Sequence, residues 1–480
     1  MRRFVILLLS LAIASSAFAG AKITILNKDG PATGFNEKTP ATPVGGNPGT
    51  TLGDQRLNAF RYAADVWGTL INSDVEIIVS ATFAPINSGT DSCNVLGSAR
   101  ATSFLLNFEK APRQNVWYPV ALANAIAGKD LQPESTDIQA QFNSLIDTDQ
   151  CTNGKWYYGL DGNHGDKIDL VVVLLHEIAH GLGISGTTSL STGADLQGFP
   201  SIHELHTFDM VTGLRWDQMS SDQRRVSTTD TARLVWDGDS TRFAANGVLG
   251  SVTTLTITAP SEIARNYDIG TAAFGPAADR TALTGTIVAA LDPTDVDGLT
   301  TLDGCTAYTN ASAIAGNIAV VDRGTCTFVK KAQNAQAAGA RGLIIADNRK
   351  DTCIPPGMGG DDATVTIPII SISQDDGDAI RKQLAGGVSA MLRIDPSTLA
   401  GANGVGNVRL YAPCTLVNGS SVFHWDVTAT PNLLMEPAIN DDLRHGVDLT
   451  LNQLIDIGWS RAVSSAPPSG RRTLKRGRKQ

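Results

Sequence analysis

The stretch that decides the fold is residues 168–183, which read IDLVVVLLHEIAHGLG. The run from Ile168 to Leu182 is almost continuously apolar, and Gly181 and Gly183 stop it. Its length and the glycines at its end predict a buried helix rather than a strand. Leu170 to Leu175 would anchor this helix in a core and hold the polar residues that follow in a fixed position.

Those polar residues have the spacing of a metal site. His176 and His180 are four residues apart, so they lie on one face of a helix and both imidazoles can reach one ion. Zinc lowers the pKa of a bound water from about 15.7 to about 7. Glu177 would lie beside the ion, where its carboxylate can take a proton from that water. The motif therefore predicts a catalytic zinc with Glu177 as general base.

A catalytic zinc usually takes a third protein ligand. In the commonest extended motif, HExxHxxGxxH, a third histidine follows the glycine, but here that position is Gly186. Two residues remain candidates: Glu204, in a following segment, and His424, much farther along the chain. Spacing favours Glu204, whereas the context of His424 favours a histidine ligand.

That context consists of His424-Trp425, then Leu434-Met435-Glu436-Pro437, then a segment ending at Trp459. In order and spacing these residues resemble the leishmanolysin family of zinc metalloproteases, within the metzincin clan. The resemblance implies that His176, His180 and His424 bind one catalytic Zn²⁺, with Met435 beneath the metal. Members of that family usually carry an inhibitory propeptide with a cysteine, whereas no long pro-segment follows Ala19 and the first cysteine is Cys93.

The long interval before His424 has strand-like and Ala-rich helical runs in alternation, which indicates a small α/β unit. Residues of about 260–396 resemble a protease-associated (PA) domain, a non-catalytic module thought to gate or bind peptides. The resemblance rests on three stretches: 318–328 (IAVVDRGTCTF), 330–340 (KKAQNAQAAGA) and 367–372 (IPIISI).

Together these features predict an α+β metzincin-like metalloprotease domain interrupted by a small α/β PA domain. The protease part would combine a mixed sheet and the active-site helix with a mostly helical or irregular C-terminal subdomain. The expected boundaries are a signal peptide at 1–19, an extended N-terminal arm at 20–53, the first protease part at 54–255, the PA insert at 256–397, the C-terminal protease part with its Met-turn at 398–460, and a disordered basic tail at 461–480.

The chain is expected to be exported. Arg2 and Arg3 precede the apolar run 4–9, and Ala17-Phe18-Ala19 supplies small residues for cleavage, as in a secretory signal peptide. No later run is long enough to span a membrane. The formal charge of the 480 residues is −9, although the C-terminal tail is basic, so the body has no electrostatic reason to bind nucleic acid or anionic lipid.

Six cysteines in an exported chain predict disulfides. The sequence contains no CxxC motif, which would have indicated a thiolate zinc site or a redox site. Proximity in sequence favours the pairs Cys93–Cys151 and Cys305–Cys326, which leaves Cys353 with Cys414. The acid pairs Asp361-Asp362 and Asp375-Asp376 offer oxygen ligands for calcium, but paired surface acids are usually just solvated.

The preferred interpretation is a secreted zinc endopeptidase that hydrolyses proteins or peptides. Residues 137–143 alternate polar and apolar side chains, as in an exposed edge strand that could pair with extended substrate. The alternative is an exported, non-catalytic binding or adhesion protein that uses its PA domain on a protease-like scaffold. An exopeptidase is ranked lower, since the scattered His and Asp pattern of zinc aminopeptidases is not evident.

Overall fold

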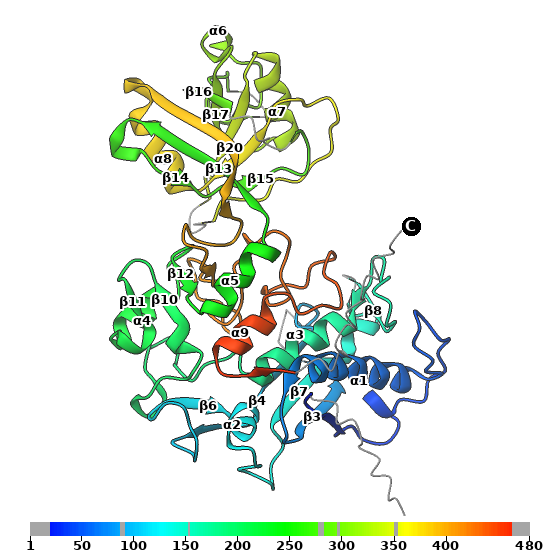
Figure 1. Ribbon diagram of the computed structural model, residues 1–480. Coiled ribbons are helices and arrows are strands. Elements are labelled where there is room, and N and C mark those ends of the chain that lie inside the picture. The colour runs from blue at the N-terminus through cyan, green and yellow to red at the C-terminus, as the bar shows by residue number, and fades with distance from the viewer. Residues whose placement is uncertain are drawn as a thin grey trace, which may run out of the picture.

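The computed structural model describes residues 20–86, 92–151, 154–276, 283–294, 298–349 and 354–462. The predicted signal peptide and nearly all of the basic tail lie outside these residues. The described chain forms two bodies, a host domain and an insert above it (Figure 1). Two strands connect the bodies, β13 (Ser251–Ala259) and β20 (Val388–Leu399), which pair antiparallel along most of their length.

The host contains a four-stranded mixed sheet in the order β1-β3-β7-β4. β1 (Ile23–Asn27), β3 (Ile77–Ala84) and β7 (Ile138–Asn143) are parallel, whereas β4 (Gly97–Ala101) pairs antiparallel with β7. β3 alternates buried and half-buried residues along its whole length, as expected for a strand with one face in the core. The predicted mixed sheet is therefore present.

Two long helices pack on this sheet and on each other: α1 (Leu52–Leu70) and α3 (Leu170–Leu182). The N-cap of α1 is Thr51, whose hydroxyl accepts a hydrogen bond from the Asp54 N–H. In α3 every residue except His180 is buried. The near-continuous apolar run thus reflects a helix surrounded by protein, as predicted.

The expectation of an extended arm over residues 20–53 is wrong. Ile23 and Ile25 belong to β1, which pairs with β3, and Phe35 packs into the host core. Arg56 in α1 also ties this segment down through a 2.6 Å ion pair with Glu37. The Pro- and Gly-rich composition indicated the turns correctly, but the short apolar alternation of residues 23–25 carried the strand signal.

The expectation that residues 137–143 form an edge strand is also wrong. β7 lies inside the sheet between β3 and β4, and β4 is the edge strand. The polar residues of β7 alternate with buried ones because Gln139 faces away from the core while Ile138 and Ala140 face into it. One-sided burial gives the same alternation as an edge position, so sequence periodicity does not separate the two.

Residues on both sides of the insert complete one host core. A single cluster of buried apolar side chains draws on residues 21–249 and 402–459. α5 (Asp239–Val248) and α9 (Thr450–Asp456) pack together across this division. The Asp456 carboxylate accepts hydrogen bonds from the Trp236 indole and from the Ser240 and Thr241 N–H groups at the start of α5. The two host segments are therefore one folding unit.

The insert has its own sheet of eight strands, in the order β14-β13-β20-β16-β17-β18-β19-β15. Separate apolar clusters cover its two faces: α7 (Phe328–Ala337) packs in one and α8 (Gln374–Gln383) in the other. In β17 (Ile318–Asp322) Ala319 points to the first cluster and Val320 to the second. The predicted strand–helix alternation is confirmed. β13 and β20 run across the boundaries expected at 255/256 and 397/398, which stay predictions.

The other α-helices and β-strands complete the described chain. They are α2 (Val120–Ala127), α4 (Ser221–Ser227), α6 (Ala311–Ile314), β2 (Ile71–Asn72), β5 (Phe104–Leu106), β6 (Trp117–Pro119), β8 (Trp156–Tyr157), β9 (Ile168–Asp169), β10 (Thr207–Asp209), β11 (Leu214–Arg215), β12 (Leu234–Trp236), β14 (Asn266–Tyr267), β15 (Gly270–Thr271), β16 (Leu283–Ala289), β18 (Gly342–Ala346), β19 (Ile369–Ile372), β21 (Val408–Arg409) and β22 (Ser460–Arg461).

Two predicted disulfides are confirmed: Cys93–Cys151 in the host and Cys305–Cys326 in the insert. Cys414 is also disulfide-bonded, while Cys353, its expected partner, lies outside the described residues. A search of the described residues for helices long and apolar enough to cross a membrane finds none.

Candidate metal centre and its cleft

The candidate centre is built on α3, and both ends of this helix are held firmly. At the start, the Asp169 carboxylate accepts a hydrogen bond from the Val171 N–H, which caps the helix. At the end, Gly183 has φ 135°, a conformation that favours glycine, and its N–H donates to the carbonyls of Ala179 and His180. The helix therefore presents His176, Glu177 and His180 from a rigid support.

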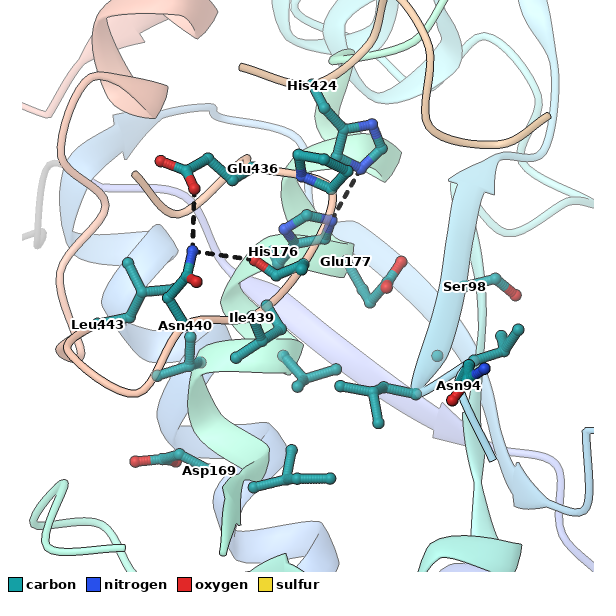
Figure 2. Close-up of a pocket in the computed structure, with 18 of the residues that line it drawn as sticks. Asn94, Ser98, Asp169, His176, Glu177, His424, Glu436, Ile439, Asn440 and Leu443 are labelled. Atoms are coloured by element: carbon teal, nitrogen blue, oxygen red, sulfur yellow. Dashed lines mark hydrogen bonds between the residues drawn. The ribbon is translucent and has the colours of Figure 1, made fainter. Parts of the chain in front are cut away.

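The structure brings His176, His180 and His424 together. His424 comes from the irregular segment after the insert, yet its Nε2 lies 3.3 Å from Nε2 of His176 and 3.3 Å from Nε2 of His180 (Figure 2). Each ring is oriented by a 2.7 Å hydrogen bond from Nδ1 to a backbone carbonyl, of Leu434, Ile184 and Ser420 respectively. Since Nδ1 carries the proton, all three Nε2 lone pairs face a common point.

This donor set fits zinc. Zn–N bonds of about 2.0–2.1 Å at tetrahedral angles place ligand nitrogens about 3.3 Å apart. Three converging lone pairs would repel one another unless a cation lies between them. Burial and the neighbouring imidazoles lower the pKa of His176 to about 3, and burial likewise lowers the pKa of His180 and His424, which favours the neutral form that binds metals. In the described part of the chain these three side chains are the one cluster able to hold a metal ion.

Glu177 is buried next to the three histidines and faces the side on which β4 lies (Figure 2). Burial raises the pKa of its carboxyl group to about 8, while a hydrogen bond with the backbone of Ala99 in β4 opposes that shift. A carboxyl group in this position can exchange a proton with a molecule bound at the histidines. The hydrogen bond with Ala99 also shows that β4 borders the centre, although the sequence did not single out this strand.

Met435 is fully buried in a tight turn below α3. Its neighbour Leu434 supplies the carbonyl that orients His176, and the Met435 carbonyl accepts a 2.7 Å hydrogen bond from the Trp425 N–H. The turn thus connects the residue after His424 with the histidine pair. The Met435 side chain is placed in the core that supports these rings, although its role beneath a metal stays a prediction.

Glu204, the other candidate ligand, is not part of the cluster. Its Oε1 accepts hydrogen bonds from the Thr187 and Thr188 N–H groups at 2.9 and 2.8 Å, and its Oε2 accepts one from the Ser201 N–H at 2.6 Å. The buried carboxylate therefore holds the loop that follows α3. The spacing that favoured Glu204 reflected this structural contact.

The other four histidines lie outside the cluster. His203 is fully buried between Trp236 and Phe423, not at the surface. His206 stacks on Trp236 near Asp237. His164 contacts Asp441 and His445 contacts Asp169, and both of these partners line the cleft described next.

A cleft of about 820 Å³ opens over the three histidines and extends along the N-terminal half of α3. β4 and the loop before it form one wall, and residues 436–443 form the opposite wall (Figure 2). Val172 and Val173 from α3 line the cleft between them, and Ile439 and Leu443 line it from the second wall. Its volume lies within the roughly 300–1,000 Å³ that ligand pockets usually have.

Comparison with known proteins identifies the insert. Residues 283–380 match the family model of the PA domain, so the chain contains such a domain. Signal peptide peptidase-like 2 of Arabidopsis thaliana is 38% identical over 96 residues, which are 19% of this chain and 17% of that protein. Aminopeptidase YwaD of Bacillus subtilis is 41% identical over 70 residues, 14% of this chain and 15% of that protein.

The chain thus spans only a small part of the relatives it matches, and their names describe different enzymes. Among solved structures, a zinc aminopeptidase from Bacillus subtilis has 22% identity and a TM-score of 0.23, and the match covers 32% of this chain and 36% of that one. Similarity at that level carries no argument about the host domain. The metal centre is therefore inferred from the geometry of the three histidines.

Proposed function

We propose that this protein is a zinc-dependent peptidase whose catalytic centre is His176, His180, His424 and Glu177. The observation that carries the proposal is the convergence of three Nε2 atoms, two of the separations being 3.3 Å, beside a buried glutamate. The geometry of the cluster supports zinc, and the cleft supports a chain-like substrate. The order of His176, His180, His424 and Met435 supports membership of the metzincins, with leishmanolysin as the family it resembles.

In this mechanism His176, His180 and His424 hold the ion. Zinc, when bound, is a Lewis acid that polarises the scissile carbonyl and acidifies a water. The Glu177 carboxylate takes a proton from the attacking water and then gives it to the nitrogen of the leaving amine. Burial favours the protonated carboxyl group, and the positive charge of a bound zinc would favour the carboxylate that the first transfer needs. Nδ1 hydrogen bonds to backbone carbonyls keep the three rings in place throughout.

Extended substrate would bind along β4. This strand is at the edge of its sheet, and Gly97, Ser98 and Ala99 line the cleft. An edge strand offers unpaired N–H and C=O groups that can pair with a peptide whatever its side chains. Because the peptide could continue past the centre in both directions, we favour an endopeptidase. This replaces the strand first expected to bind substrate, which is inside the sheet.

Two alternatives to an endopeptidase can be distinguished by peptide-cleavage assays. Two of the relatives that match part of this chain are named aminopeptidases, so an exopeptidase is the second candidate. An exported protein that only binds peptides through its PA domain is the third. An endopeptidase cleaves a peptide whose N-terminus is acetylated, an aminopeptidase does not, and a binding protein cleaves neither form.

The primary test is metal analysis of the purified protein combined with cleavage of fluorescent casein and of matched free and acetylated peptides. We expect about one zinc per chain, and cleavage of both peptides that a chelator abolishes and added zinc restores. A zinc-loaded protein that hydrolyses no peptide would overturn the peptidase proposal. Cleavage restricted to the free N-terminus would establish the exopeptidase instead.

A further inference from the structure

One wall of the cleft depends on side-chain contacts for its position. Residues 438–447, here called the wall loop, contain no helix or strand. Within the described chain, its backbone-to-backbone hydrogen bonds join Leu443 to Asn440, Gly446 to Arg444, and Val447 to Thr450 at the start of α9, so none of them joins the loop to α3. A segment without ladder hydrogen bonds to a neighbouring element opens more easily than a strand or helix. Other contacts must therefore fix it against α3.

Two contacts, each made by a histidine, join the wall loop to residues that lie just before α3. His445 Nε2 donates to Asp169 Oδ2 at 2.8 Å, and the side chains of these residues are only 10% and 3% exposed. His164 lies just before α3, and its Nε2 lies 3.1 Å from the wall-loop carbonyl of Asp441, while its Nδ1 lies 2.8 Å from the carbonyl of Lys167, so a neutral ring donates to one of the two at a time. We call these two contacts the clasp.

The clasp joins the wall loop to the helix that carries the metal ligands. The second oxygen of Asp169, Oδ1, caps α3 through the Val171 N–H, so one carboxylate holds both the helix start and the loop. His445 also packs edge-on against Tyr62 of α1, with ring centroids 5.5 Å apart. At its other end the loop is tied to the Met-turn by the Asn440 amide, which donates to Glu436 Oε2 at 2.9 Å.

The apolar lining of the cleft depends on this arrangement. Ile439 and Leu443 from the wall loop line the cleft together with Val172 and Val173 from α3. A shift of the loop changes the space between these two apolar pairs without moving β4 or the three histidines. Hydrophobic pockets discriminate side chains by the fit of single methylene groups, each worth about 1–3 kcal/mol.

We propose that His445 and His164 are positioning residues that hold the wall loop against α3 and so set which substrate side chains the cleft admits. The expected effect on substrate selectivity rests on the proposed peptidase function. The expected effect on the position of the wall loop does not. Neither residue exchanges protons with substrate or binds the metal. Loss of the clasp loosens the wall, so the cleft accepts large and small side chains more equally.

The test compares His445→Leu, which keeps bulk beside Tyr62 but has no donor, with His445→Gln, which keeps a donor. Hydrogen exchange should become at least about 5-fold faster in residues 438–447 of His445→Leu, while α9 and β18 are unchanged. The kcat/KM ratio between peptides with large and small apolar residues at the cleavage site should change by about 5-fold or more, mainly through KM. His445→Gln should restore both readouts, and zinc content should stay constant.

His164 is half-buried, so truncation to alanine should be tolerated. His164→Ala should show the same faster hydrogen exchange in residues 438–447. It keeps the inference testable if His445→Leu misfolds. Unchanged exchange in the wall loop, or an equal loss of kcat/KM for every peptide, would overturn the inference. If the wild-type protein cleaves no peptide, the peptidase proposal fails, and the exchange result alone decides whether the histidines hold the loop.

Discussion

The host domain and the insert bury their apolar residues in different ways. The host has one core made from two chain segments separated by the whole insert, whereas the insert builds two cores from a single continuous segment. The proposed metal centre follows the first pattern, because two of its three histidines precede the insert and the third follows it. A site that needs both host segments forms only when they pack together.

The difference also explains how a PA domain fits between ligands of one metal. β13 and β20 enter and leave the insert side by side, so their host ends remain close together. At this junction the Gly250 N–H donates to the Thr430 carbonyl at 2.7 Å, and Arg409 forms a 2.9 Å ion pair with Asp268 of the insert side. Insertion between adjacent ends leaves the host core intact.

The largest expected effect tests whether the host alone carries the chemistry. Glu177→Gln should reduce peptide hydrolysis by about 10²- to 10⁴-fold, since the amide cannot take up and release the proton. Zinc content, measured by metal analysis, should not change. Glu134→Gln, at an exposed loop position, is the control and should keep full activity. A Glu177→Gln protein that cleaves casein at the wild-type rate would remove the role given to this residue.

The next effect tests whether the centre needs both host segments. His424→Ala should weaken zinc affinity by more than about 100-fold, beyond the loss seen when only a ligand's hydrogen-bond partner is removed. Glu204→Ala should keep zinc but lower the free energy of unfolding, because three buried N–H groups lose their acceptor. Equilibrium metal competition and denaturant unfolding measure the two quantities. The opposite pattern of zinc loss would make Glu204 the ligand.

A matched pair of core substitutions tests whether the two bodies unfold separately. Ile345→Ala in the insert and Leu174→Ala in α3 each remove a fully buried side chain and should cost about 2–5 kcal/mol. Calorimetry should show that Ile345→Ala lowers only the transition of the insert and leaves zinc bound. Leu174→Ala should lower the host transition and release zinc more easily. A single transition shifted equally by both variants would show that the bodies unfold together.

The smallest effect concerns a buried lysine in the insert. Burial lowers the pKa of Lys331 from its usual 10.5 to about 8, while Asp303 opposes this shift. Between these pH values the unfolded chain binds more protons than the folded one, so stability of the insert should rise as pH increases from about 8 to about 10.5. Lys331→Met should lack that rise in a series of thermal unfolding scans. The host transition serves as the internal reference, and identical pH profiles for the two proteins would contradict the shift.

Much of the centre could be predicted because its signals are local. The spacing of His176 and His180 fixes both rings on one helical turn, and the apolar run before them predicts burial of that helix. The alternation of strands and helices in the insert is likewise a local pattern. Residues 137–143 show the limit, since one-sided burial produces an alternation that an edge strand also produces.

The sequence by itself determined the helix with its paired histidines and the alternating insert, because neighbouring residues encode these features, and it favoured two of the disulfides by proximity along the chain. Only the tertiary structure brought His424 within 3.3 Å of the pair, assigned Glu204 to three backbone N–H groups, and joined His445 to Asp169. The contacts of His424 and His445 join residues far apart in the chain, those of Glu204 reach residues up to 17 positions away, and the packing of the shared core rather than any local repeat sets all of them.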